Sequence, residues 1–139
     1  MRITVILGIT AIGKKLPPYI IFKGRQNAII QKKLEKLDLV VNKKAFIACN
    51  LNAWSIIEVM KDYQDKIWQT FITKHLFSMG RSLLIMDSAP VHISEEIKNL
   101  YLSNNKRLLF IPPDLTSVLQ PLDVLINKLF KDGIRNKYS

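Results

Sequence analysis

Two aspartates stand where a carboxylate could take part in chemistry in this sequence of 139 residues. Asp87 directly follows the apolar run Leu83–Met86, which predicts a buried strand with an acid at its carboxyl end. Asp123 comes shortly after Pro121, a residue that favours the first turn of a helix because its missing N–H costs nothing there. If the two carboxylates converge, their hard oxygen atoms would suit Mg²⁺ or Mn²⁺.

Both acids also have an ordinary structural explanation. An aspartate in the first turn of a helix complements the helix dipole, as Asp123 could. An aspartate after a strand often closes a loop through its own backbone, as Asp87 could. Spacing alone leaves the metal site and these structural roles open.

The sequence segments around the two acids resemble those of a known protein family. Leu83–His92 and Leu115–Lys131 resemble the DDE superfamily transposase domain of the pogo/Tigger type, and Val5–Gly24 and Trp54–Trp68 resemble it in the same order. The similarity covers nearly the whole chain. It implies an α/β, ribonuclease-H-like fold, a mixed sheet with helices on its faces, in a single partial catalytic domain over residues 1–139.

The resemblance also implies the chemistry. Enzymes of this superfamily cut DNA with two divalent ions, Mg²⁺ or Mn²⁺, and then join the freed strand end to a target. Asp87 matches the second of the three metal-binding catalytic acids of the family and Asp123 matches the third. The first acid belongs to an opening strand ahead of the segment matched by Ile3–Thr10, whereas the first carboxylate of this chain is Glu35. We therefore expect a sheet that lacks its first, central strand, and a chain that is inactive alone.

Loss of a central strand has a structural consequence. Either a gap remains in the sheet or the strand from Ile3 pairs directly with the strand ending at Asp87. A gap would leave backbone groups unsatisfied, at about 1–3 kcal/mol for each buried group. The expectation is reduced stability, or completion of the sheet by another chain or by self-association.

Three residues near the acids are possible accessories: His92, Gln120 and Lys128. His92, five positions after Asp87, could approach the metal site or a phosphate, or could simply bond to backbone as a loop histidine. Gln120 is expected, with Thr116 and Ser117, to fix the loop that presents Asp123.

The charge balance points to a partner rich in phosphates. Lys and Arg number 21 against 11 Asp and Glu, a formal net charge of +10. Lys128, Lys131 and Arg135 lie on the basic side of the predicted last helix and could contact DNA, although a solvated helix face explains them equally well. An anionic membrane surface is the other possible partner, but neither a basic amphipathic helix nor an apolar run of about 18 residues stands out. Cys49, the single cysteine, is expected to be a small core residue.

Periodicity predicts the elements that must position these residues. A hairpin, a second strand pair and a long helix with a capping box at Ser55 and Glu58 come first, and Trp54 and Trp68 are expected in the core. After the strand to Asp87 come a helix capped by Ser94, another strand, a loop and a basic last helix with an apolar side. The predicted strands are Ile3–Thr10, Leu16–Lys23, Leu39–Val41, Ala45–Cys49 and Arg107–Ile111, and the loop is 114–120.

Three functional interpretations remain open at this stage. The chain is a nucleic-acid-binding fragment of a pogo/Tigger-like transposase, inactive alone; a domesticated, non-catalytic DNA-associated protein of the nucleus; or an active endonuclease whose true start lies upstream of Met1. All three imply DNA as partner and the nucleus as location.

Overall fold

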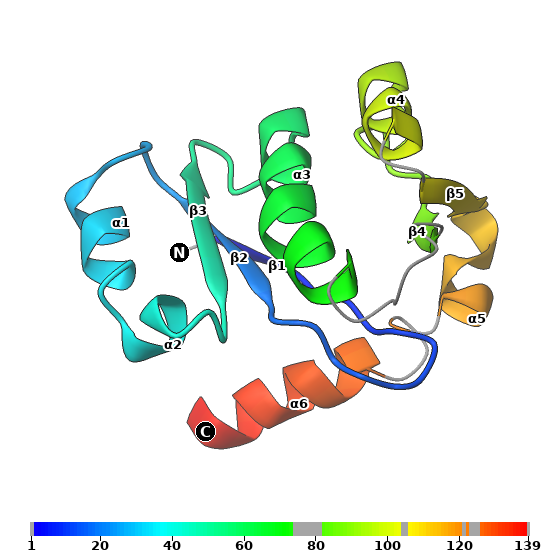
Figure 1. The fold of residues 1–139 in the computed structure, drawn as a ribbon. Coiled ribbons are helices and arrows are strands. Elements are labelled where there is room, and N and C mark those ends of the chain that lie inside the picture. Colours follow the sequence, from blue (N-terminus) through cyan, green and yellow to red (C-terminus); the bar gives the residue numbers. More distant parts are fainter. Residues whose placement is uncertain (1, 74–81, 104–105, 121, 123–125, 139) are drawn as a thin grey trace. The chain divides into compact units, whose positions relative to one another are not determined.

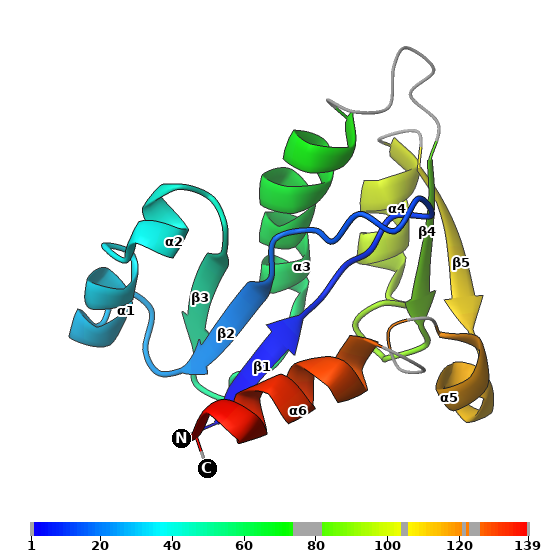
Figure 2. The same cartoon turned by 90° about the horizontal axis from the view of Figure 1, so that it is seen from below.

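The computed structural model describes residues 2–73, 82–103, 106–120, 122 and 126–138. The chain divides into two compact units, Met1–Met79 and Gly80–Ser139. Figures 1 and 2 show the elements of both units from two sides. The mixture of helices with parallel and antiparallel strands confirms the predicted α/β class.

The first unit is a three-stranded sheet with helices. Its strand order is β1-β2-β3, in which β2 lies antiparallel to β1 and parallel to β3. The elements are β1 (Ile3–Ile6), β2 (Tyr19–Lys23), α1 (Ile29–Leu34), α2 (Asp38–Val41), β3 (Phe46–Asn50), α3 (Ile57–Tyr63) and a π-helical segment (Gln64–Thr73) that continues α3.

The predicted hairpin of β1 and β2 is confirmed, with Ile3 opposite Phe22 and Ile6 opposite Tyr19. The strands are shorter than the apolar pattern suggested, and a bridge between Ile9 and Lys15 extends the pairing toward the turn. Gly13 occupies this turn at φ 82°, a conformation that glycine adopts without strain.

The core of the first unit lies between β2 and α3, which runs along one face of the sheet (Figure 1). Tyr19 and Ile21 alternate inward from β2, as the two-residue period of a strand requires. The ring of Tyr63 packs edge-on against the ring of Tyr19, with 6.0 Å between the ring centroids. Phe71 packs in the same way against Phe46 of β3, with 6.2 Å between the centroids. Cys49 is buried as expected, and burial raises the pKa of its thiol.

Three predictions in this unit are wrong. Residues 39–41 were expected in a strand but belong to α2, where the Asn42 amide donates to Asp38 Oδ1 at 2.6 Å and closes a local helical turn. The capping box is absent: Ile56 is the N-cap of α3, and the buried Ser55 Oγ has no hydrogen-bond partner among the described residues. Trp68 is buried, but Trp54 precedes the helix, remains 52% exposed and lies beneath the Arg2 guanidinium.

In its described residues, the second unit contains a parallel strand pair and several helical elements. Its elements are β4 (Ser82–Asp87), α4 (Glu95–Ser103), β5 (Lys106–Ile111), a 3₁₀ turn (Pro113–Leu115), α5 (Thr116–Leu119) and α6 (Asn127–Tyr138). β4 and β5 run in the same direction, joined by α4, with Ser82 opposite Lys106 and Asp87 opposite Ile111 (Figure 2). Parallel strands need such a crossover.

Ser94 caps α4 as predicted, because its Oγ accepts a hydrogen bond from the Ile97 N–H at 3.4 Å. Ile97 and Tyr101 are fully buried on the inner side of the helix. The buried amine of Lys106, at the start of β5, lies over the Tyr101 ring at 5.8 Å.

Three further expectations for this unit need correction. β4 was expected to be buried, but Met86 is buried while Leu83 and Ile85 are about half exposed, so one face of the strand stays open. The predicted loop 114–120 contains α5, and the Thr116 hydroxyl donates to the carbonyl of Pro113 in the turn before it. The apolar side predicted for the last helix is largely exposed, with Leu129 at 70%.

The sheet topology bears on the expected missing strand. In the first unit β1 pairs with β2, and in the second unit β4 pairs with β5. The direct pairing of the first strand with the strand ending at Asp87 stays a prediction. Each of these two strands is an edge of its own sheet. No helix within the described ranges is long and apolar enough to span a membrane.

Candidate functional site

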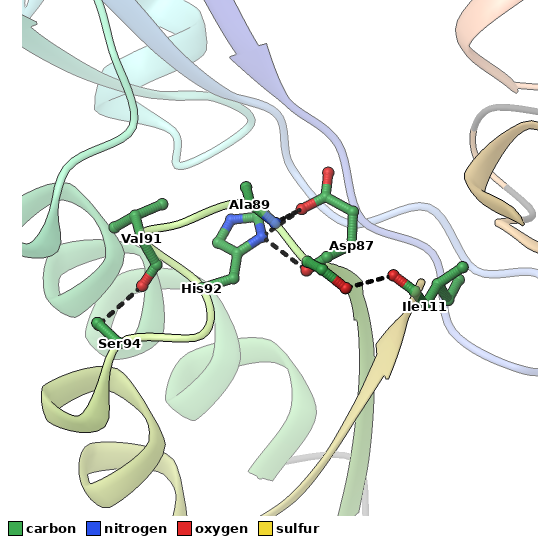
Figure 3. Close-up of polar contacts among 7 residues, drawn as sticks. Asp87, Ala89, Val91, His92, Ser94 and Ile111 are labelled. Atoms are coloured by element: carbon green, nitrogen blue, oxygen red, sulfur yellow. Dashed lines mark hydrogen bonds and ion pairs between the residues drawn. The ribbon is translucent and has the colours of Figure 1, made fainter. Parts of the chain in front are cut away.

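The second unit carries the candidate site, which begins with Asp87 at the carboxyl end of β4. The parallel register fixes this end beside Ile111, the last residue of β5 (Figure 3). Strand alternation holds Asp87 on the same face as Leu83 and Ile85, and its side chain is 38% exposed. The sequence predicted both the strand and the position of the acid at its end.

One carboxylate oxygen of Asp87 is already engaged. Oδ1 accepts a hydrogen bond from the Ala89 N–H at 3.0 Å and lies 2.6 Å from His92 Nδ1 (Figure 3). No hydrogen bond from a described residue reaches Oδ2. The carboxylate is therefore held from one side and open on the other.

The loop between β4 and α4 brings His92 to Asp87. The His92 and Ile93 N–H groups both donate to the Ala89 carbonyl, at 2.8 and 3.2 Å, and close a tight turn. The imidazole is 18% exposed. Its Nδ1 contacts the acid and, at a longer 3.3 Å, the Asp87 carbonyl. The approach of His92 to a metal or a phosphate stays a prediction.

Both ends of this loop are tied down. At its start the Ser88 hydroxyl donates to the Ile111 carbonyl at 2.5 Å, which links the loop to β5. At its end the Ser94 hydroxyl donates to the Val91 carbonyl at 2.8 Å while it caps α4. The loop geometry is thus set by the strand before it and the helix after it.

Sequence reasoning missed two of these contributors, the backbone amide of Ala89 and the hydroxyl of Ser88. The first had a signal, since an aspartate followed two residues later by a free N–H is typical of an Asx-turn. The Ser88 contact joins residues far apart in sequence and has no local signal.

The second predicted acid, Asp123, lies outside the described residues, so the pairing of Asp87 with Asp123 stays a prediction. Within the described part of the chain, no three His, Cys, Asp or Glu side chains gather in a group that could hold a metal ion. Gln120 ends α5 with its backbone N–H bonded to the Thr116 carbonyl at 3.1 Å. Its side-chain Oε1 is buried with no hydrogen-bond partner among the described residues, and its role beside Asp123 is untested.

The three predicted DNA-contacting cations gather on α6. Lys128, Lys131 and Arg135 recur at helical spacing on one face, and they line an open hollow together with Asn127 and Asp132. Arg135 also forms a long ion pair of 3.5 Å with Asp132. The hollow presents more positive than negative charge, as a phosphate-binding surface requires.

The chain is similar to known proteins over its full length. Residues 1–139 match the family model described as DDE superfamily endonuclease. The chain is 32% identical over 139 residues to the human and mouse proteins named "Pogo transposable element with KRAB domain", and 25% identical over 137 residues to the human "Pogo transposable element with ZNF domain". It spans 21% of the length of the first two relatives and 9% of the third, while they cover 100% and 96% of this chain. No solved structure matches it.

Proposed function

Because this chain belongs to the DDE superfamily of endonucleases, we propose that it is a nucleic-acid-binding part of a pogo-like transposase that acts on DNA in the nucleus. The observation that carries the proposal is Asp87. It lies at the end of a strand with one carboxylate oxygen fixed by Ala89 and His92, and the other not bonded by any described residue. Such a carboxylate is arranged to accept a cation.

The donor chemistry fits a divalent metal in part. Asp87 supplies one hard oxygen ligand of the kind that Mg²⁺ and Mn²⁺ prefer, and Asp123 would supply another. When bound, a pair of such ions would activate a water nucleophile and stabilise charge on the leaving oxygen of a phosphodiester. In this proposal the catalytic and metal-binding residues of the chain are Asp87 and Asp123.

Two acids fall short of a full two-ion site. The sequence holds no Asp or Glu before Glu35, so none of the first 34 residues can supply a third carboxylate. We expect the 139-residue polypeptide, purified by itself, to leave supercoiled DNA intact in Mg²⁺ or Mn²⁺. Nicking that disappears with Asp87→Asn would contradict this expectation.

Contact with DNA is assigned to α6. Lys128, Lys131 and Arg135 would neutralise successive phosphates along the backbone, a contact that positions nucleic acid without reading its sequence.

Completion of the sheet by another chain, or by self-association, forms part of the proposal. A two-stranded sheet is below the number of strands that is usually stable alone, and β4 and β5 both have a free edge within the described strands. Sedimentation velocity over a range of concentrations tests the self-association alternative. A dimer whose fraction rises with concentration supports self-association, and a strict monomer contradicts it.

Calorimetric titration of Mn²⁺ into the purified chain tests the site. We expect binding in the wild type and its loss in both Asp87→Asn and Asp123→Asn, because each substitution replaces an anionic carboxylate with a neutral amide of similar shape. Asp114→Asn is the matched control, since Asp114 is an exposed aspartate of the 3₁₀ turn. A folded wild type that binds no Mn²⁺, or an equal loss in the control, would overturn the metal proposal.

A further inference from the structure

We propose that His92 is a positioning residue for Asp87: its imidazole carries a proton on Nδ1, donates it to Asp87 Oδ1, and thereby reserves Oδ2 for the divalent cation. This inference rests on the proposed function, because it assumes that Asp87 binds metal. It adds a residue that acts through the acid.

The surroundings of His92 Nδ1 decide which ring nitrogen carries the proton. Nδ1 lies 2.6 Å from Asp87 Oδ1 and 3.3 Å from the Asp87 carbonyl oxygen. An ionised carboxylate and a carbonyl both accept hydrogen bonds and cannot donate. Nδ1 must therefore be the donor, and in the neutral ring Nε2 carries the lone pair.

The same geometry gives the two carboxylate oxygens of Asp87 different roles. Oδ1 receives two hydrogen bonds, from His92 and from the Ala89 amide, so its lone pairs are taken. Oδ2 receives none from the described residues and keeps its lone pairs for a ligand. Hydrogen bonds to one oxygen also fix the rotation of the carboxylate, which a cation would otherwise have to order on binding.

The imidazole is itself held in place. It is mostly buried, it follows the turn closed on the Ala89 carbonyl, and that loop is tied to β5 through Ser88 and to α4 through Ser94 (Figure 3). Because the His92 side chain is already held in this way, it loses little further conformational entropy when it orients the Asp87 carboxylate. Loss of such an orienting contact typically weakens metal affinity about 10- to 100-fold.

Two amide substitutions separate the ring nitrogens in the test. In His92→Asn the side-chain amide can occupy the place of Nδ1, whereas in His92→Gln the longer side chain carries its amide toward the place of Nε2. We expect calorimetric Mn²⁺ affinity close to that of the wild type in His92→Asn, and about 10- to 100-fold weaker in His92→Gln and His92→Ala. A purely structural role would give no such rescue by asparagine.

A metal-free measurement on the same 139-residue chain checks the bond directly. At mildly alkaline pH, a two-bond ¹H–¹⁵N correlation spectrum reports which ring nitrogen holds the proton. We expect the proton of His92 on Nδ1 in the wild type, and loss of this preference in Asp87→Ala. This readout needs no His92 variant, so it stands even if a substitution at that position impairs folding.

The outcomes separate the two levels of the proposal. A wild type without Mn²⁺ binding defeats the proposed function. Binding that is unchanged in His92→Ala, or a wild-type proton found on Nε2, defeats the role of His92 while Asp87 remains a ligand. Affinity retained by His92→Gln and lost in His92→Asn would move the role to Nε2 and overturn the inference as stated.

Discussion

At the scale of single residues, the first unit contains a buried polar contact that its sequence does not predict. Tyr19 is 1% exposed, and its hydroxyl donates to the Asp62 carboxylate, which also pairs with Lys66 at 2.8 Å. The Asp62 side chain is 37% exposed to solvent, and it gives this buried phenol a hydrogen-bond partner. Residues 43 positions apart make this contact, and no local pattern predicts it.

Tyr19 and Tyr63, which are buried in the first unit, predict a loss of stability at alkaline pH. Burial raises the pKa of Tyr63 to about 12, and burial together with the neighbouring Asp62 carboxylate raises the pKa of Tyr19. The unfolded chain releases these protons near pH 10.0 while the folded chain keeps them, so stability is full below that pH and falls as pH rises toward the folded values. For Tyr63 the loss should reach about 2 kcal/mol near pH 11.5.

Urea unfolding at about pH 9 and about pH 11.5 measures this effect. Tyr63→Phe removes the titrating group and keeps the ring, so its stability should fall less between the two pH values than that of the wild type. Equal falls in both proteins would contradict the assignment.

The positions of Asp87 and His92 in the fold could be predicted because their signals are local. Asp87 follows an apolar run and His92 follows it by five positions, and both lie where the sequence indicated. The carboxylate orientation depends on the Ala89 amide and on the Ser88 bond to β5, which become visible only when the strands are paired.

At the scale of elements, the two serines proposed as helix caps illustrate what patterns can and cannot decide. Ser94 caps α4, whereas Ser55 stands one residue before the N-cap of α3 and its hydroxyl is buried without a described partner. Both are followed by a glutamate and an apolar face, so sequence alone treats them alike. The start of each helix, which tertiary packing sets, makes the difference.

These serines give a matched pair of substitutions. Ser94→Ala should cost about 0.5–2 kcal/mol, because it removes the cap of α4 and the bond to the Val91 carbonyl. Ser55→Ala should be neutral or stabilising, because it removes a buried hydroxyl that makes no hydrogen bond within the described structure. Chemical denaturation followed by circular dichroism compares them, and a larger cost for Ser55→Ala would count against the described helix starts.

Element types were predicted best where the periodic run was long. The hairpin, β3, α3, β4, α4, β5 and α6 all exist, with ends that differ by a few residues. The short run Leu39–Val41 misled because three apolar residues favour a strand, while the local bond from Asn42 to Asp38 stabilises a helical turn. Similarly, the 3₁₀ turn and α5 occupy a stretch whose prolines and small polar residues indicated a loop.

At the scale of the whole molecule, the net charge of +10 determines how the chain should respond to salt. Each neutralised phosphate releases counterions, so the logarithm of DNA affinity falls with the logarithm of salt concentration at about 0.9 per contact. If the whole positive surface binds DNA diffusely, removing any three charges should change the salt slope alike. If one patch contacts the phosphates, only substitutions in that patch should change it strongly.

Two triple variants distinguish these cases. Replacing Lys128, Lys131 and Arg135 with glutamine should lower the salt slope by up to about 3, if all three contact phosphates. Replacing the exposed Lys32, Lys33 and Lys36 of the first unit with glutamine removes the same charge and should change the slope far less. Fluorescence anisotropy across a salt series measures both, and equal slopes would mean that α6 is not the DNA-contacting surface.

The parallel pairing of β4 with β5 also governs when the Asp87 strand can form. Among the described strands, β5 is the ladder partner of β4, and it follows β4 only after the return through α4. On the ribosome, a nascent chain that has emerged only as far as Ser103 contains the aspartate, the histidine and α4 but no partner for β4. A gene split after Ser103 would therefore yield two polypeptides that restore this strand pair only by reassociating, which makes that junction suited to a split-protein reporter of assembly.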